Sequence, residues 1–302
     1  MKSSQTVSPE YFPMSDSASS GASVKVACCQ VALAIGDTAG NRARVRTAIL
    51  NAAAVGAQVV VLPELANSGY MFADLAELHS CAEPLEGSTV QEWTDLASAH
   101  GLIIVGGLAE AGADGRVYNA AVLIDASGLR ASYRKVHLWD NENNNLFTPG
   151  SAAPPVVDTA LGRIGVMVCY DLEFPEWVRA AALAGADLLC APVNWPLFPR
   201  PTGERPSEVV KVQAGASVNR MFIAVADRAG RERGQDWLGG SVIVDADGYP
   251  QTTLALGVEG MHMATVTLSD ARNKHVSARN HVLTDRRAEL YTDLSAGREV
   301  AD

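Results

Sequence analysis

The sequence lacks the features that define membrane, metal-binding and disulfide-stabilised proteins. It contains no run of about 18 or more apolar residues, so no membrane-spanning helix is expected. Cysteine is scarce and odd in number, and no CxxC pair or histidine spacing indicates a metal site. A reducing cytoplasm is the compartment we expect for such a chain. The five cysteines are Cys28, Cys29, Cys81, Cys169 and Cys190.

Basic residues are also fewer than acidic ones. The 302 residues include 24 Lys and Arg against 34 Asp and Glu, which gives a net charge of -10. This balance argues against nucleic acid or an anionic membrane as the main partner. Hydrophobic residues make up 48% of the chain, which is ample material for a core. Residues 1–22 are rich in Ser and lack the apolar stretch of a signal peptide, so we expect a disordered N-terminal tail.

Short apolar segments alternate with segments of helical spacing along the rest of the chain. This alternation predicts a mixed α/β protein with helices on both faces of its sheets. No linker divides residues 23–270, so one domain is expected there, followed by an arm of mixed charge at 271–302. The expected strands include 24–31, 59–62, 102–107, 117–124, 164–168, 187–193, 221–226 and 261–266, and the expected helices are 42–56, 89–100, 177–186 and 207–219.

Three residues with reactive side chains stand where predicted strands end. Glu64 closes the strand at 59–62, Lys135 follows the second strand of a hairpin, and Cys169 closes the strand at 164–168. Binding groups in layered sheet proteins gather at strand ends. A carboxylate, an ammonium and a thiol together could supply a base, an oxyanion stabiliser and a nucleophile.

Each of these residues has an ordinary alternative interpretation. Glu64 could be a surface carboxylate, Lys135 a solvated charge beside Arg134, and Cys169 one more buried cysteine. Taken singly, none of them establishes a catalytic site. Two other classes also remain open, namely a non-catalytic binding or assembly protein and a redox role for Cys169. The redox role would need a resolving cysteine close by, and the sequence has none near Cys169.

The segments around these three residues resemble the signature segments of the nitrilase superfamily, the carbon–nitrogen hydrolases. They are VVLPE at 60–64, YRKVHL at 133–138 and GVMVCYDLEFPE at 165–176. They occur in the family's order, with the three central residues 71 and 34 positions apart. Segments 191–195 and 239–248 also look like family segments, so the resemblance covers the chain from about Val24 to about Val266.

The resemblance implies a four-layer α-β-β-α sandwich, built into a homodimer or a larger homo-oligomer. It implies that Glu64 is the general base, Lys135 the oxyanion stabiliser and Cys169 the nucleophile, with a thioester intermediate and no metal or organic cofactor. A second glutamate is common between the Lys and the Cys of this family. Counting from Lys135 selects Glu142, whereas counting back from Gly150 selects Asn143, and we take Glu142.

The resemblance is strongest to the amide-hydrolysing branch. Tyr170-Asp171 follows the cysteine, where true nitrilases commonly have Trp-Glu. We therefore expect hydrolysis of a small aliphatic amide to its acid and ammonia, with Tyr170, Asn194 and Trp195 contacting the substrate. Trp139 and Phe198 are further aromatic candidates for the pocket, although aromatic residues are more often core.

The main alternative substrate is an N-carbamoyl amino acid, and a nitrile is the less favoured one. An enzyme for N-carbamoyl amino acids must bind a carboxylate, typically with arginine. Arg179, Arg200 and Arg205 are available for that role, although solvated loop charges are an equally good interpretation. The arm at 271–302 is expected to lie at a subunit interface, because members of the family that the sequence resembles usually form oligomers.

Overall fold

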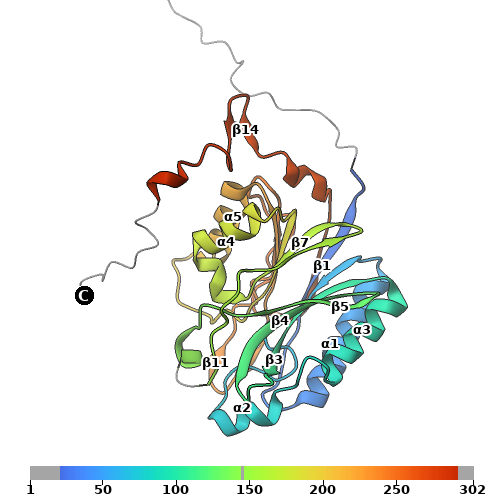
Figure 1. The fold of residues 1–302 in the computed structure, drawn as a ribbon. Coiled ribbons are helices and arrows are strands. Elements are labelled where there is room, and N and C mark those ends of the chain that lie inside the picture. The colour runs from blue at the N-terminus through green and yellow to red at the C-terminus, as the bar shows by residue number, and fades with distance from the viewer. Residues whose placement is uncertain (1–20, 144–145, 292–302) are drawn as a thin grey trace, which may run out of the picture.

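The computed structural model describes residues 21–143 and 146–291. Two sheets form the centre of the molecule (Figure 1). The first sheet has the order β13 (Gly260–Val266), β1 (Val24–Gln30), β2 (Val59–Val61), β3 (Ile103–Ala111), β4 (Val117–Asp125) and β5 (Gly128–Arg134). The second has the order β12 (Val242–Val244), β9 (Phe222–Ala226), β8 (Leu188–Pro192), β7 (Gly162–Val166) and β6 (Val156–Thr159).

Helices cover the outer face of each sheet. Helices α1 (Thr38–Ala54) and α3 (Ser88–His100) lie on the first sheet, and α4 (Pro175–Leu183) and α5 (Ser207–Asn219) lie on the second (Figure 1). The predicted α-β-β-α sandwich is therefore confirmed. The smaller helical elements are α2 (Leu75–Cys81) and the 3₁₀ helices η1 (Asp140–Asn143), η2 (Cys169–Glu173), η3 (Leu268–Arg272) and η4 (Ala288–Leu290). Two short antiparallel strand pairs lie outside the main sheets. They are β10 (Arg231–Glu232) with β11 (Gln235–Asp236), and β14 (His275–Ser277) with β15 (Asn280–His281).

The apolar strands of the first sheet supply both neighbouring layers of the core. Successive side chains of a strand point to opposite faces. Val26 and Cys28 of β1 accordingly pack in the core between the two sheets, whereas Ala27 and Cys29 pack toward α1 and α3. A strand covered on both faces needs apolar residues at every position, which is why β1 reads as a continuous apolar run.

The strand predicted at 102–107 does not end at its glycines. It continues as β3 to Ala111, with Gly106 and Gly107 in its interior. A Cβ atom on Gly107 would lie 2.6 Å from Cα of Glu64 and 2.8 Å from N of Leu65. Glycine is needed there because the segment that carries Glu64 crosses directly over β3, and not because the strand stops.

Two helices also differ from the sequence-based expectation. Helix α1 begins at Thr38 rather than at 42, since the side chain of Asp37 accepts a hydrogen bond from N of Gly40 and caps the helix. Helix α2 is not among the helices expected from the sequence, and Asp74 caps it in the same way through N of Glu77.

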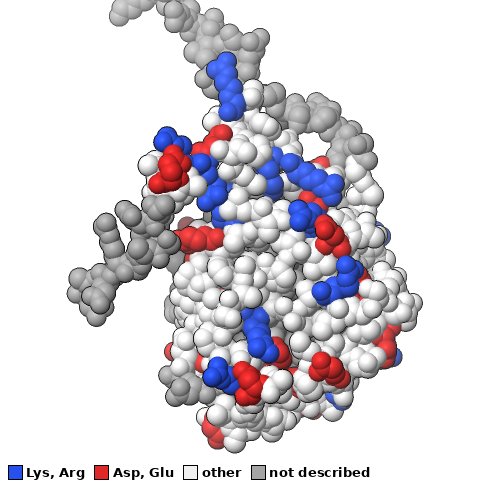
Figure 2. Space-filling model, in the orientation of Figure 1, with Lys and Arg blue, Asp and Glu red and all other residues white. Residues whose placement is uncertain are grey.

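The domain division predicted from the sequence stays a prediction. The predicted tail falls outside the described residues up to residue 20, and so do residues 292–302 of the predicted arm. The described part of the arm includes the β14–β15 hairpin, which projects beyond the sandwich (Figure 1). Acidic and basic side chains are interspersed on the face that Figure 2 shows. Within residues 21–143 and 146–291, no helix is both long enough and apolar enough to cross a bilayer.

The close crossing at Gly107 gives a test of how the fold positions Glu64. We expect Gly107→Ala to lower the free energy of unfolding by about 1–3 kcal/mol, because the added methyl group meets backbone atoms that cannot move independently. Gly260→Ala on β13 is the matched control, since a Cβ atom there meets nothing within 4 Å. Urea unfolding of both variants measures this difference. Equal free energies of unfolding for the two variants would contradict a close crossing at Gly107.

Candidate active site

The three reactive residues predicted from the sequence come together between the two sheets. Glu64 lies just beyond β2 and Lys135 just beyond β5, so the first sheet carries both. Cys169 follows β7 of the second sheet and opens η2. The thiol lies close enough to Glu64 and Lys135 for both charges to act on its pKa. Strand ends of two facing sheets thus converge on one site.

The base of this site is a closed ring of hydrogen bonds. The Lys135 ammonium donates to Oε1 of Glu64 at 2.8 Å and to Oε1 of Glu142 at 2.9 Å. Nδ2 of Asn119 donates to the same two oxygens, at 2.7 and 2.9 Å. The other carboxylate oxygen of Glu142 accepts the backbone N–H of Trp139 at 2.8 Å. The four side chains of the ring are all buried.

The pKa values of the charged groups in this ring depend on their burial and on their contacts with one another. Burial alone would lower the pKa of Lys135, but Glu142 and Glu64 outweigh it and hold that pKa well above its usual value. Burial raises the pKa of Glu64, and the contact with Lys135 partly offsets the rise. Lys135 is therefore a permanent cation, and Glu64 is a carboxylate that accepts a proton more readily than an exposed glutamate.

Cys169 sits on a sharp turn at the start of η2. Its φ is 45°, in the left-handed region that non-glycine residues seldom adopt. Leu65 and Asp140, beside Glu64 and Glu142, also have positive φ values, of 50° and 42°. Such backbone geometry persists only where the surrounding structure holds it, and it is concentrated at functional sites.

The Cys169 thiol is protonated at rest. Burial and the Glu64 charge raise its pKa, while Lys135 and the backbone N–H of Asn194 oppose the rise. The pKa remains well above the usual value for a thiol. Because the thiolate is the nucleophilic form, Cys169 needs a base at the moment of attack. Of the two carboxylates in the ring, Glu64 is the one with a free oxygen, since its Oε2 has no partner among the described residues.

A further buried carboxylate, that of Asp171, connects the lysine segment to the cysteine turn. Oδ2 of Asp171 accepts the hydroxyl of Tyr133 at 2.8 Å, and Oδ1 accepts the backbone N–H of His137 at 3.0 Å. The ring Nδ1 of His137 lies 2.7 Å from the same Oδ1. Tyr133 and His137 flank Lys135, and Asp171 comes two residues after Cys169, so Asp171 fixes the lysine relative to the thiol.

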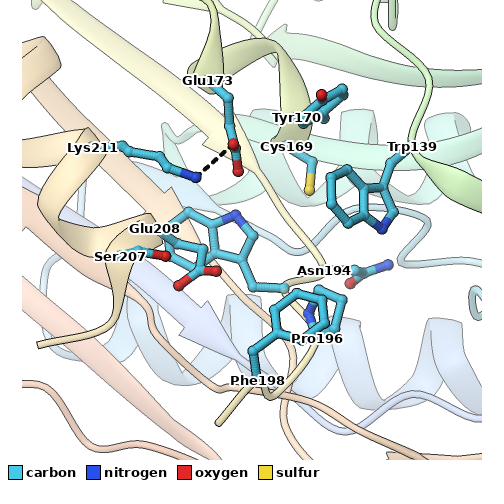
Figure 3. Close-up of a pocket in the computed structure, with 11 residues that line it drawn as sticks. Trp139, Cys169, Tyr170, Glu173, Asn194, Pro196, Phe198, Ser207, Glu208 and Lys211 are labelled. Atoms are coloured by element: carbon cyan, nitrogen blue, oxygen red, sulfur yellow. Dashed lines mark hydrogen bonds and ion pairs between the residues drawn. The ribbon is translucent and has the colours of Figure 1, made fainter. Parts of the chain in front are cut away.

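The thiol opens into a cavity of about 210 Å³ (Figure 3). Trp139, Tyr170, Trp195 and Phe198 form its aromatic wall. Charged side chains line the cavity as well, and among them the Lys211 ammonium is paired with Glu173 at 2.5 Å (Figure 3). The cavity is small for a ligand site, since sites for drug-sized ligands typically span about 300–1,000 Å³.

Asn194 and Trp195 are held in place at the cavity by contacts behind them. Nδ2 of Asn194 donates to the backbone carbonyl of Glu64 at 3.1 Å. The backbone N–H of Trp195 donates to the buried carboxylate of Asp227 at 3.0 Å. Together with Tyr170 these two residues line the cavity, as the sequence led us to expect. Their contact with a substrate stays a prediction.

The structure separates the candidates that the sequence left open. Glu142, and not Asn143, lies beside Lys135; Nδ2 of Asn143 instead donates to the carbonyl of Leu138. The three arginines considered for a substrate carboxylate do not line the cavity over Cys169. Arg179 donates to the carbonyls of Val282 and Val218, Arg205 pairs with Gln213, and Arg200 lines a different hollow.

Sequence reasoning missed Asn119 and Asp171. Asn119 lies in the apolar run of β4, and an isolated polar residue in a buried strand was a signal that could have been used. Asp171 follows the cysteine in the segment at 165–176, but its partners at Tyr133 and His137 are visible only in three dimensions. Among the described residues, no group of three or more His, Cys, Asp or Glu is placed to hold a metal ion.

Comparison with known proteins finds hydrolases of carbon–nitrogen bonds. The family model for carbon–nitrogen hydrolase matches residues 25–275. A "Nitrilase" of Pyrococcus abyssi is 35% identical over 271 residues, which is 89% of this chain and 99% of that protein. An "(R)-stereoselective amidase" of a Pseudomonas species is 34% identical over 226 residues, 74% of this chain and 78% of that protein.

A solved structure of an amidase from a Nesterenkonia species superposes on this chain with a TM-score of 0.74. The identity is 27%, and the match covers 90% of this chain and 96% of that one. A variant of the Nesterenkonia amidase has been solved with the acetamide moiety of fluoroacetamide added covalently at its active-site cysteine.

The burial of the cysteines predicts a single reactive thiol. Cys169 is 7% exposed and lines the cavity, whereas the other four cysteines are 0–2% exposed. We expect iodoacetamide to add one carboxamidomethyl group per folded chain, at Cys169, and none to the folded Cys169→Ala variant. Intact-mass measurement with peptide mapping checks this, and urea-unfolded protein is the control in which all five thiols react. Labelling of another cysteine first would contradict the assignment.

Proposed function

This chain belongs to the carbon–nitrogen hydrolase family and is an amidase, and we propose that it converts a small aliphatic amide to a carboxylic acid and ammonia through a thioester on Cys169. The observation that carries the proposal is the buried Lys135 ammonium held between Glu64 and Glu142, beside a thiol that opens into a small cavity. We assign Glu64 as general base, Lys135 as oxyanion stabiliser and Cys169 as nucleophile, with Glu142 as a supporting catalytic carboxylate.

In the first half-reaction, Oε2 of Glu64 takes the thiol proton as Sγ attacks the amide carbonyl carbon. Negative charge moves onto the carbonyl oxygen, where the Lys135 ammonium and the backbone N–H of Tyr170 receive it. Tyr170 is at the start of η2, where helix N–H groups have no partner within the helix. Removing one oxyanion donor typically costs about 3–4 kcal/mol, roughly 10²–10³ in rate.

The first half-reaction ends when the proton on Glu64 passes to the amide nitrogen, the C–N bond breaks and ammonia leaves. The acyl group remains on Sγ as a thioester. In the second half-reaction, Glu64 removes a proton from water, the hydroxide oxygen attacks the thioester carbonyl, and the proton returns to Sγ as the acid departs. Glu142 holds Lys135 and Asn119 in register during both steps. The residues that we assign thus supply every proton transfer.

The cavity favours a neutral amide over an N-carbamoyl amino acid. An amino acid carboxylate needs a free cation, best supplied by arginine. Of the three arginines considered, none lines the cavity over Cys169, and the Lys211 ammonium that does so is already paired with Glu173. The volume of about 210 Å³ and the aromatic wall suit a short aliphatic acyl group.

We further propose that the chain works as a cytoplasmic homodimer or larger homo-oligomer, with the arm at 271–302 at a subunit interface. Supporting this proposal, the β14–β15 hairpin projects from the sandwich (Figure 1), and Val276 on it is 54% exposed.

A panel of substrates tests the proposed reaction. We expect ammonia release from propionamide, little or none from propionitrile or an N-carbamoyl amino acid, and a loss of at least about 10⁴-fold in Cys169→Ala. Cys81→Ala is the matched control, because Cys81 is also a buried cysteine but lies in α2, away from the cavity.

Each outcome of the panel has a distinct meaning. Release from the carbamoyl compound instead of the amide would replace the proposed substrate class. Substantial amide hydrolysis by a folded Cys169→Ala protein would overturn the role of the thiol itself.

A further inference from the structure

We propose that Asn119 is a positioning residue that holds the Oε1 atoms of Glu64 and Glu142 at Lys135, so that the other oxygen of Glu64 is oriented to accept a proton. The inference rests on the proposed function and adds a residue to it. Both hydrogen bonds that Nδ2 of Asn119 donates go to the two carboxylates, so Asn119 would act through them and not on the substrate.

The hydrogen bonds in the ring divide the two carboxylates into different roles. Oε1 of each glutamate receives two donors, the Lys135 ammonium and Nδ2 of Asn119. The remaining oxygen of Glu142 is also occupied, by the backbone N–H of Trp139. The remaining oxygen of Glu64 has no partner among the described residues. Only Glu64 therefore has an oxygen free to take the thiol proton.

The charges of the ring favour a neutral hydrogen-bond donor at position 119. Two carboxylates share one ammonium, so one negative charge in the ring has no cation of its own. A second cation at position 119 would compensate it, and would also weaken Glu64 as a base. An apolar residue would remove one of the two donors that the carboxylates share and leave the Lys135 ammonium. The amide of Asn119 gives the Oε1 atom of each carboxylate a second hydrogen bond without adding charge.

The strand pairing explains how Asn119 reaches this position. Strands β4 and β5 are antiparallel, with Ala120 opposite Arg134. The backbone N–H of Lys135 donates to the carbonyl of Asn119 at 2.8 Å, so the two residues are neighbours across the pair. Asn119 is 1% exposed and its Oδ1 has no partner among the described residues. A fold that needed only packing here would be better served by an apolar side chain.

The effect on Glu64 has a definite sign. Burial raises the pKa of Glu64, whereas Lys135 and the hydrogen bond from Asn119 lower it. Glu142, Cys169, Tyr70 and Arg228 are the other ionisable groups whose charges couple to Glu64. Removal of the Asn119 donor raises the pKa of Glu64 further. The base then remains protonated to higher pH, and activity is lost on the acid side.

The test is the pH profile of kcat/KM in wild type and in Asn119→Leu, which keeps the side-chain shape and removes the donor. We expect the acid limb to move up by about one pH unit, with the loss mainly in kcat and not in KM. Asn219→Leu is the matched control, because Asn219 is also 1% exposed, has an unpartnered Oδ1, and lies in α5 away from the ring. The control should lower thermal stability without moving the acid limb.

A second variant covers the case in which Asn119→Leu does not fold. Asn119→Asp keeps the volume and places a third carboxyl group in the ring, so the acid limb should again move up. An unshifted limb in a folded Asn119 variant, with wild type active, would overturn the role of Asn119 and leave the proposed function standing. No amide hydrolysis by folded wild type would instead refute the proposed function, and with it this inference.

Discussion

The ammonium of Lys135, buried between two carboxylates, is the contact on which the rest of the site depends. A buried cation without partners would lose its proton, and buried carboxylates without a cation would take one up. Here Glu64 and Glu142 raise the pKa of Lys135 and keep it charged. Lys135 in turn lowers the pKa of Glu64, which favours the ionised carboxylate that can act as a base. Removing one partner from such a buried pair typically costs about 3–5 kcal/mol, because the other charge is left uncompensated.

The fold supplies this contact by bringing together segments that are far apart in the sequence. Glu64 and Lys135 follow strands of one sheet, and Cys169 follows a strand of the other. Gly107 lets the Glu64 segment cross β3 closely, and Asp171 ties the backbone around Lys135 to the turn at Cys169. The reactive groups are thus fixed by the strands and by buried polar contacts, as preorganised catalysis requires.

Much of this arrangement could be predicted from the sequence, and the rest depends on contacts that sequence spacing does not encode. The apolar strands and the signature segments pointed to the sandwich and to Glu64, Lys135 and Cys169. Counting residues left Glu142 and Asn143 open, because the answer depends on which side chain turns inward toward Lys135. The partnership of Asn119 with the two carboxylates depends on the register of β4 and β5, which hydrophobic pattern alone does not specify.

Trapping the acyl-enzyme shows whether Cys169 carries the acyl group of an amide. Wild-type protein mixed with propionamide, quenched in acid within milliseconds and measured by intact mass, should show a fraction heavier by one propionyl group, located on Cys169 by peptide mapping. Added hydroxylamine should divert this acyl group to the hydroxamate. Steady turnover with no acyl adduct and no hydroxamate would contradict the thioester route.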